Sequence, residues 1–316
     1  MSAKPKVFID GEHGTTGLQI RQRLAGRDDV EVLSLAAADR RDADKRARLL
    51  NEADIAILCL PDDGAREAVA MLAAAGNGHT RVIDASTAHR TADGWVFGFA
   101  EMTRGQRQAI AAARFVANPG CYSTGSIALL RPLIERQVLP PAYPVTINAV
   151  SGYSGGGKSL IAQMEDSSRD DHIGANLFLY ALTLAHKHVP EIMLRAGLTR
   201  RPVMTPNVGR FAQGMLVNLP LHLDLLNGAP DVADIHALMS EHYAGQDVVR
   251  VAALEQCAQL PRVDAEEMVG TDEMRLYVFG TPGRGQVNLV ASLDNLGKGA
   301  SGAAVQNLDI MLNGRG

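Results

Sequence analysis

The stretch "KVFIDGEHGTTGLQIRQRLAG", residues 6–26, decides the fold of the first part of the chain. It opens with a short apolar run that is typical of a strand and closes with apolar residues at helical spacing. Between them the glycines follow the pattern Gly11-x-x-Gly14-x-x-Gly17. Strand, glycine turn and helix together predict a loop that binds nucleotide phosphates. Because the spacing differs from the common GxGxxG, an ordinary turn is the alternative interpretation.

The segments that follow extend this alternation of strands and helices. "EVLSL", "DIAILCL" and "RVIDAS" are candidate strands, with helical patterns in "REAVAMLAAAG" and "MTRGQRQAIAAA". Such alternation predicts a parallel sheet of the Rossmann-like kind. Farther along, "VTINAVSG", "MLVNLPLHL", "RVAAL", "EMRLYVFG" and "QVNLVASLD" read as strands around a single helix, "DIHALMSEHYAG". We therefore expect an α/β protein with a Rossmann-like parallel sheet domain and an α+β domain with a largely antiparallel sheet.

Composition and charge narrow the class of protein. The chain has 316 residues, enough for two domains, with 46% hydrophobic and 21% charged residues, which is typical of a globular protein. A net charge of −4 gives no reason to expect a nucleic-acid or membrane partner. The first residues lack the apolar core of a signal peptide, and no segment approaches the length of a membrane span. We expect a cytoplasmic protein.

The three cysteines have different settings. They are widely spaced and odd in number, which argues against a disulfide scaffold or a CxxC zinc site and fits a reducing compartment. Cys59 lies in an apolar run, and Cys257 has no glycine turn or nearby base. Cys121, in "NPGCYSTG", stands where a helix should begin, and the positive end of a helix dipole favours a thiolate. The alternative is a buried structural cysteine.

A nucleophilic cysteine needs a base, and "LTLAHKHVPEI" offers His186 and His188, with Glu191 to orient them. Pro190 argues for an extended or loop conformation. The H-x-H pair also resembles a zinc motif, but no third ligand is obvious, so we expect no metal. A pair of buried or surface histidines without a chemical role is a further interpretation.

Two segments bear on the cofactor. The end of the second predicted strand has Ser34 and then Arg40 and Arg41, with no acid before Asp39 to hold the ribose hydroxyl of NAD. This favours the 2′-phosphate of NADP, although the arginines equally suit the start of a solvated helix. The loop "SGYSGGGK", residues 151–158, would either cradle a phosphate or serve as a hairpin or linker.

Five motifs, in this order, resemble those of the N-acetyl-γ-glutamyl-phosphate reductase family in its shorter form, and more distantly the aspartate-semialdehyde dehydrogenases: "DASTAHR", "NPGCYSTG", "SGYSGGGK", "HKHVPEI" and "DNLGKGASGAAVQN". The resemblance covers nearly the whole chain. It implies reduction of an acyl phosphate to an aldehyde with NADP(H) in arginine biosynthesis. A cysteine thiolate would expel phosphate to give a thioester, which a hydride then reduces.

The resemblance also implies roles for individual residues. Cys121 would be the nucleophile and His186 the base. Substrate binding would fall to Ser86, Arg90, Asn118, His188 and Glu191. Cofactor binding would fall to Gly11, Gly14, Thr15, Thr16, Gly17, Ser34, Arg40, Ser154, Gly155 and Asn295.

At the level of domains, the resemblance implies a dinucleotide-binding domain of residues 1–119 and 297–316. Residues 120–296 would form the catalytic and oligomerisation domain of a dimer or tetramer. Two rival interpretations are another acyl-phosphate reductase, such as aspartate-semialdehyde dehydrogenase or its lysine-pathway equivalent, and a non-catalytic nucleotide sensor. The set of Cys121, His186 and Arg90 argues against the sensor.

Overall fold

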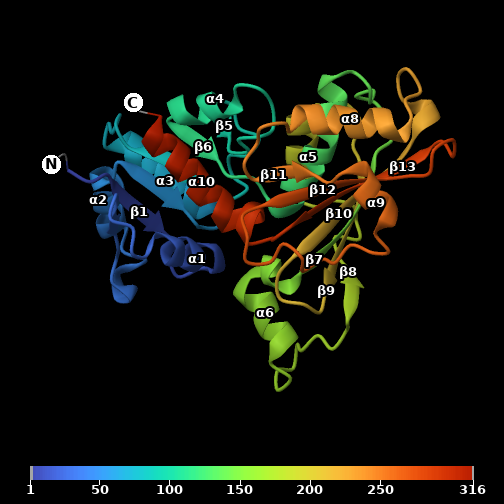
Figure 1. Ribbon diagram of the computed structural model, residues 1–316. Helices are drawn as coiled ribbons and strands as arrows, with labels where there is room; N and C mark the ends of the chain where they lie inside the picture. The colour runs from blue at the N-terminus through green and yellow to red at the C-terminus, as the bar shows by residue number, and fades with distance from the viewer. Residues whose placement is uncertain (1–2, 315–316) are drawn as a thin grey trace. The chain divides into compact units, whose positions relative to one another are not determined.

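The computed structural model describes residues 3–314, which form two compact units. The first unit comprises the described parts of 1–100, 105–119 and 300–316, and the second comprises 101–104 and 120–299. Helices alternate with strands in the first unit, whereas most of the long strands belong to the second (Figure 1).

The first unit is built on a six-stranded sheet with the order β2-β1-β3-β4-β6-β5, in which every neighbouring pair is parallel. This confirms the predicted Rossmann-like sheet. Its strands are β1 (Lys6–Asp10), β2 (Glu31–Leu33), β3 (Ile55–Leu58), β4 (Arg81–Asp84), β5 (Val96–Phe97) and β6 (Phe115–Ala117). Its helices are α1 (Thr15–Leu24), α2 (Ala43–Glu52), α3 (Asp62–Ala74), α4 (Gln106–Ala112) and α10 (Gly302–Asn313).

Side chains of β1 alternate between two apolar layers, as expected for a sheet covered on both faces. Val7 and Ile9 belong to a core with residues of α1 and α10, whereas Phe8 belongs to a core with residues of α2 and α3. The last helix thus completes the first unit, because Leu308 and Met311 bury their side chains there (Figure 1, red helix).

The second unit is built on a seven-stranded sheet with the order β11-β12-β13-β10-β7-β9-β8. Only the β11–β12 and β7–β9 pairs are parallel among its described strands, which confirms a largely antiparallel sheet. Its strands are β7 (Thr146–Gly152), β8 (Leu177–Leu179), β9 (Val203–Gly209), β10 (Met215–His222), β11 (Val249–Val251), β12 (Met274–Phe279) and β13 (Gln286–Leu293). Its helices are α5 (Cys121–Glu135), α6 (Gly157–Glu165), α7 (Val189–Ala196), α8 (Val232–His242) and α9 (Leu254–Gln259).

Helix α5 packs closely on one face of this sheet. A Cβ atom added at Gly125 would lie 2.7 Å from Cγ2 of Val217 and 3.5 Å from Cβ of Ala291, so only glycine allows this approach. Val217 and Ala291 are paired across β10 and β13. Their neighbour Val290 points to the opposite face, where it packs with Tyr277 and Cys257.

Two segments differ from the expectations or refine them. The "SGYSGGGK" segment is not a hairpin or linker: it closes β7, makes a 3-10 turn over Tyr153–Gly156 and begins α6. The histidine segment is a loop, as expected, but it leads directly into α7. Pro190 lies in the first turn of α7, where the missing N–H would have no partner within the helix.

Candidate active site

Cys121 is the first residue of α5, which confirms its predicted place at a helix start. The residue is partly exposed. At this end of the helix the first N–H groups lack carbonyl partners within the helix, so the local field favours a thiolate over a thiol. The preceding residue is fixed from another element, because the N–H of Gly120 donates to Oε1 of Glu191 at 2.9 Å. Glu191 is 1% exposed and belongs to α7.

His186 is held at both ring nitrogens. The backbone N–H of His188 donates to Nδ1 of His186 at 3.1 Å, and Nε2 lies 3.0 Å from Oη of Tyr180. Because a backbone amide only donates, Nδ1 must carry the lone pair of the neutral ring. The proton then sits on Nε2 and points to the tyrosine oxygen. Burial lowers the pKa of His186 to about 4, so the ring is neutral near neutral pH.

Two tyrosines and His188 surround this ring. The Tyr122 ring centroid lies 5.6 Å from that of His186 and 6.0 Å from that of His188, while the two imidazoles are 4.7 Å apart. Burial raises the pKa values of Tyr122 and Tyr180, and the charge of a Cys121 thiolate raises both further. The phenols are therefore near enough to Cys121 to sense its ionisation. The structure brings Cys121, His186, His188 and Glu191 together.

A glycine turn lies against the cysteine. Residues Gly297–Ser301 form a π-helical turn, and a Cβ atom added at Gly299 would lie 2.8 Å from Cβ of Cys121. The N–H of Gly299 donates to the carbonyl oxygen of Asp294 at 3.0 Å. Gly299 was not among the predicted site residues, although the glycines of "DNLGKGASG" indicate that backbone approaches closely there.

Ser154, Gly155 and Asn295 also meet in the second unit. The Nδ2 group of Asn295 donates to Oγ of Ser154 at 3.0 Å, and its Oδ1 accepts the N–H of Gly214 at 2.8 Å. A Cβ atom added at Gly155 would lie 3.4 Å from Nδ2 of Asn295. Asn295 is 1% exposed and ties the 3-10 turn that follows β7 to the end of β13.

The remaining predicted substrate residues meet in the first unit, after the carboxyl ends of β4 and β6. The guanidinium of Arg90 donates through Nε to the carbonyl oxygen of Asn118 at 2.9 Å and through Nη2 to that of Ala85 at 3.0 Å. The Oγ of Ser86 donates to Asp84 at 2.8 Å. Ser86, Arg90 and Asn118 are all buried. These hydrogen bonds hold the cluster in place. Two donor groups of Arg90, Nε and Nη2, are already used by backbone carbonyl oxygens.

The glycine loop is packed so closely that two of its positions have no room for a side chain. Gly11 has φ +91°, and a Cβ atom there would lie 2.3 Å from the carbonyl oxygen of Cys59. A Cβ atom at Gly17 would lie 2.3 Å from the carbonyl oxygen of Gly11. Thr15 and Thr16 open α1, whose N-terminus faces the loop. A hollow of about 190 Å³ beside the loop is also lined by Arg40. Backbone amides and a guanidinium therefore fit the phosphates of a dinucleotide.

Ser34 has a partner that the sequence did not suggest. Its hydroxyl donates to Oε2 of Glu12 at 3.1 Å, and Arg21 forms an ion pair with the same oxygen at 3.1 Å. The Glu12 side chain is 5% exposed. An acid thus does stand at the end of β2, but it comes from the glycine loop rather than from the strand. Reasoning about strand ends alone misses it.

The other two cysteines have poor settings for catalysis. Burial raises the pKa of Cys59 to about 12, with the charges of Asp84 and Asp10 adding to the effect. Burial also raises the pKa of Cys257. Both thiols therefore stay protonated near neutral pH, in contrast to the helix-start environment of Cys121.

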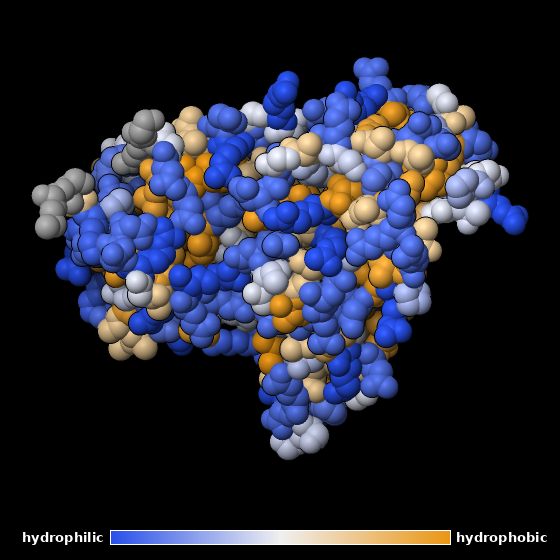
Figure 2. All heavy atoms as spheres, viewed as in Figure 1, coloured by the Kyte–Doolittle hydropathy of each residue, from blue (hydrophilic) through white to orange (hydrophobic). Residues whose placement is uncertain are grey.

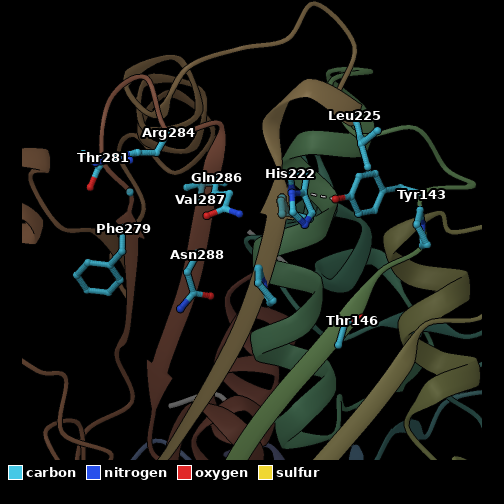
Figure 3. Close-up of a pocket in the computed structure, with 14 residues that line it drawn as sticks. Tyr143, Thr146, His222, Leu225, Phe279, Thr281, Arg284, Gln286, Val287 and Asn288 are labelled. Carbon is cyan, nitrogen blue, oxygen red and sulfur yellow. Dashed lines mark hydrogen bonds between the residues drawn. The ribbon is translucent and has the colours of Figure 1, made fainter.

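A second, larger hollow lies at the other end of the second sheet (Figure 3). Its volume is about 1020 Å³, and its lining includes Thr146, His222 and Gln286. These residues begin β7, end β10 and begin β13, whereas Ser154 and Asn295 follow the opposite ends of β7 and β13. The N–H of His222 donates to Oη of Tyr143 at 3.0 Å within it (Figure 3). None of the predicted site residues lines this hollow.

Within residues 3–314, no group of three side chains of the metal-binding types converges on one point. Nor does this part of the chain contain a helix that is both long and apolar enough to span a bilayer. On the face shown in Figure 2, apolar residues are interspersed among hydrophilic ones.

Comparisons with known proteins cover almost the whole chain. The family model for the semialdehyde dehydrogenase NAD binding domain matches residues 6–112, and the model for the semialdehyde dehydrogenase dimerisation domain matches residues 121–295. N-acetyl-gamma-glutamyl-phosphate reductase from Brucella suis is 64% identical over 309 residues, which is 98% of this chain and 99% of that protein. The reductase from Brucella ovis is 63% identical over the same coverage.

Solved structures share the fold at low sequence identity. Aspartate semialdehyde dehydrogenase II from Vibrio cholerae is 17% identical, with a TM-score of 0.71 over 98% of this chain and 99% of that one. Aspartate semialdehyde dehydrogenase from Candida albicans, solved with NADP, is 14% identical, with a TM-score of 0.66 over 99% of each chain.

Proposed function

We propose that this chain, which belongs to the semialdehyde dehydrogenase family and within it to the N-acetyl-γ-glutamyl-phosphate reductases, reduces N-acetyl-γ-glutamyl phosphate to N-acetylglutamate semialdehyde. Phosphate is released, and the reaction belongs to arginine biosynthesis. The observation that carries the chemistry is the place of Cys121 at the start of α5, where the next residue, Tyr122, has its ring 5.6 Å from the neutral ring of His186. That pairing suits acyl transfer to a thiolate.

Cys121 is the proposed nucleophile. Its thiolate sulfur attacks the acyl carbon, the bond to the phosphate oxygen breaks, and a thioester remains on the enzyme. NADPH, when bound, supplies the hydride that reduces this thioester. The carbon–sulfur bond then breaks, which returns the thiolate and releases the aldehyde. The N-terminus of α5 stabilises the sulfur whenever it carries negative charge.

His186 is the proposed proton-transfer residue. In the arrangement seen, Nε2 carries the proton and can donate it, while Nδ1 accepts the His188 amide. To accept the thiol proton at Nε2, the ring must first move its own proton to Nδ1, which breaks the contact with that amide. In such a step the hydroxyl oxygen of Tyr180 would no longer accept the proton of Nε2. We assign the base role to His186 on the family resemblance, with His188 as its support; the role requires this change of tautomer.

Two groups of residues, one in each unit, are proposed to bind the substrate. In the first unit Arg90 is the proposed ligand for the substrate's carboxylate or phosphate, with Ser86 and Asn118 beside it. In the second unit His188 and Glu191 are the proposed supports for the reacting end. The hydrogen bond from Gly120 to Glu191 supports a role in fixing the backbone before Cys121.

NADP(H) is the proposed cofactor, bound by the domain formed from residues 1–119 and 297–316. Its phosphates would lie on the amides of the loop at Gly11, Gly14 and Gly17 and on Thr15 and Thr16, with Arg40 and Ser34 toward the 2′-phosphate. Ser154, Gly155 and Asn295 are proposed for the nicotinamide end. Asn295 would do this by holding the turn at Ser154, because both its amide atoms are engaged.

The remaining proposals concern assembly and place. The domain of residues 120–296 is the proposed catalytic and oligomerisation domain of a homodimer or homotetramer, in keeping with the dimerisation model that it matches. A biosynthetic reductase with these thiols suits the cytoplasm.

The test is the reverse reaction with purified protein, NADP and phosphate. N-acetylglutamate semialdehyde should be oxidised far faster than aspartate semialdehyde, and omission of phosphate should stop turnover. Cys121→Ala is the negative control, and His186→Asn should lower kcat by roughly 10²–10⁴-fold. If His188→Asn is the more damaging change, the two histidines exchange roles. Faster turnover of aspartate semialdehyde would assign the chain to the rival activity.

A further inference from the structure

A buried ion pair lies in the second unit without a role in the chemistry described so far. Nζ of Lys298 and Oε2 of Glu101 are 2.6 Å apart, and their side chains are 2% and 3% exposed. The residues are 197 positions apart in the sequence. Removing two charges from water is costly, and apolar residues of similar size in the same place often stabilise a protein at least as much as a buried ion pair does. The pair therefore calls for an explanation other than stability.

The Glu101 end is fastened to the helices of the second unit. The carbonyl oxygen of Met102 is 3.1 Å from Nε2 of His242, the last residue of α8, and Oγ1 of Thr103 donates to Glu135 at 2.7 Å. Glu135 is the last residue of α5. Burial raises the pKa of Tyr243, and the charge of Glu101 raises it further, so Glu101 also lies near α8. Glu101 is thus fixed to the frame that carries Cys121.

The Lys298 end lies between two glycines that leave no room for side chains. A Cβ atom added at Gly297 would lie 2.1 Å from the carbonyl oxygen of Thr271, and one at Gly299 would lie 2.8 Å from Cβ of Cys121. The backbone of the π-helical turn is therefore packed between Thr271 and the cysteine. Lys298 supplies the side chain that ties this part of the turn to the helical frame. Such turns often occur at functional sites.

We propose that Lys298, through its ion pair with Glu101, is a positioning residue that holds the glycine turn against Cys121. The ammonium of Lys298 sets the distance between the backbone at Gly299 and Cβ of Cys121. That distance decides from which directions a substrate can reach the thiolate. A misplacement of about 1 Å can lower a rate on the order of 10²-fold. The inference rests on the proposed function only in taking Cys121 as the reacting thiol.

The most informative variant is Glu101→Asp, because it keeps both charges and shortens the tether by one methylene. Lys298→Met alone would strand a buried carboxylate and endanger folding. The double variant Glu101→Met/Lys298→Met removes both charges together and serves as the second test. Val249→Ala is the matched control: Val249 is 1% exposed in the edge strand β11, so the change should lower stability without touching the turn.

Three experiments are done on each full-length variant. They give the thermal midpoint, kcat and KM for the acyl phosphate, and the pH dependence of iodoacetamide labelling at Cys121, followed by peptide mass spectrometry. Glu101→Asp and the double variant should fold, keep KM within about threefold, and lose roughly tenfold or more in kcat. Their labelling curves should change in rate or midpoint. Val249→Ala should keep wild-type kcat and labelling, although its thermal midpoint falls about as far as those of Glu101→Asp and the double variant.

The proposal is overturned if Glu101→Asp and the double variant keep wild-type kcat and labelling. It is equally overturned if Val249→Ala loses as much kcat at the same thermal midpoint, because the loss then reflects stability alone. The labelling assay separates this inference from the proposed function. If wild-type protein turns over no acyl phosphate yet the labelling curves still differ, the function is wrong and the positioning role stands.

Discussion

Lowering the pH from about 7 to about 5 should destabilise the native protein through His186. In the native protein its pKa is about 4, lowered from the ordinary 6.5 by burial and to a smaller extent by Lys187. Below pH 6.5 the unfolded chain therefore binds a proton at this ring that the native protein takes up only near pH 4. The free energy of unfolding must fall as the pH falls through this window.

The size of the effect follows from the two pKa values. His186 should contribute its full share, about 3 kcal/mol, at pH values above 6.5, and lose it progressively down to pH 4. Between about pH 7 and pH 5 the loss should be about 2 kcal/mol. His186 is 7% exposed, so little of the effect should be screened by solvent.

The assay is urea unfolding of wild type and His186→Asn at both pH values, followed by circular dichroism. Subtracting the variant's pH dependence from that of wild type cancels the carboxylates that titrate in both. His79→Asn, which replaces an exposed histidine of the first unit, is the control for the substitution itself. A wild-type loss between the two pH values that matches the variant's within about 0.5 kcal/mol would refute a buried, neutral His186. So would an NMR titration of its ring with a midpoint near 6.5.

Three further predictions concern the site itself. Cys121→Ala should abolish turnover and leave cofactor affinity near wild type in a binding titration; activity above a few per cent of wild type would remove Cys121 from the chemistry. Glu12→Gln deletes a negative charge beside Ser34, so kcat/KM with NADPH should rise relative to NADH, by about tenfold for a contact of about 1.4 kcal/mol; a shift toward NADH would contradict the placing of the 2′-phosphate there. Gly299→Ala should reduce kcat on the order of 10²-fold because its methyl group overlaps Cys121, while Gly174→Ala, which meets nothing within 4 Å, should not change kcat; equal effects in the two variants would show that the turn has room to spare.

Much of the fold follows from local features of the sequence. A strand such as "KVFID" and the helix after the glycine loop each depend on residues within one or two turns of each other, so their pattern can be read directly. The start of α5 at Cys121 is likewise local, since Pro119 and Gly120 end the preceding extended segment. Three strands were not predicted. The edge strands β5 and β8 have only two and three residues, and in β9 Pro206 interrupts the apolar run.

The roles of the site residues depend on neighbours that the sequence does not identify. The family resemblance implied that His186 serves a reactive thiol, but the tertiary structure decides that Nδ1 accepts an amide and that Nε2 faces Tyr180. The sequence around Ser34 has no acid at the end of the strand, yet the glycine loop brings the Glu12 carboxylate to the Ser34 hydroxyl.

By itself, the sequence determined the alternation of strands and helices, the glycine loop and the helix that begins with Cys121. Each of these depends on backbone preferences and apolar periodicity over a few neighbouring residues. Only the tertiary structure decided the tautomer of His186, the closeness of Gly299 to Cys121 and the pairing of Lys298 with Glu101. Those contacts join residues far apart in the chain. Their distances depend on how whole elements pack, and packing is set by the combined shape of many side chains rather than by any short pattern.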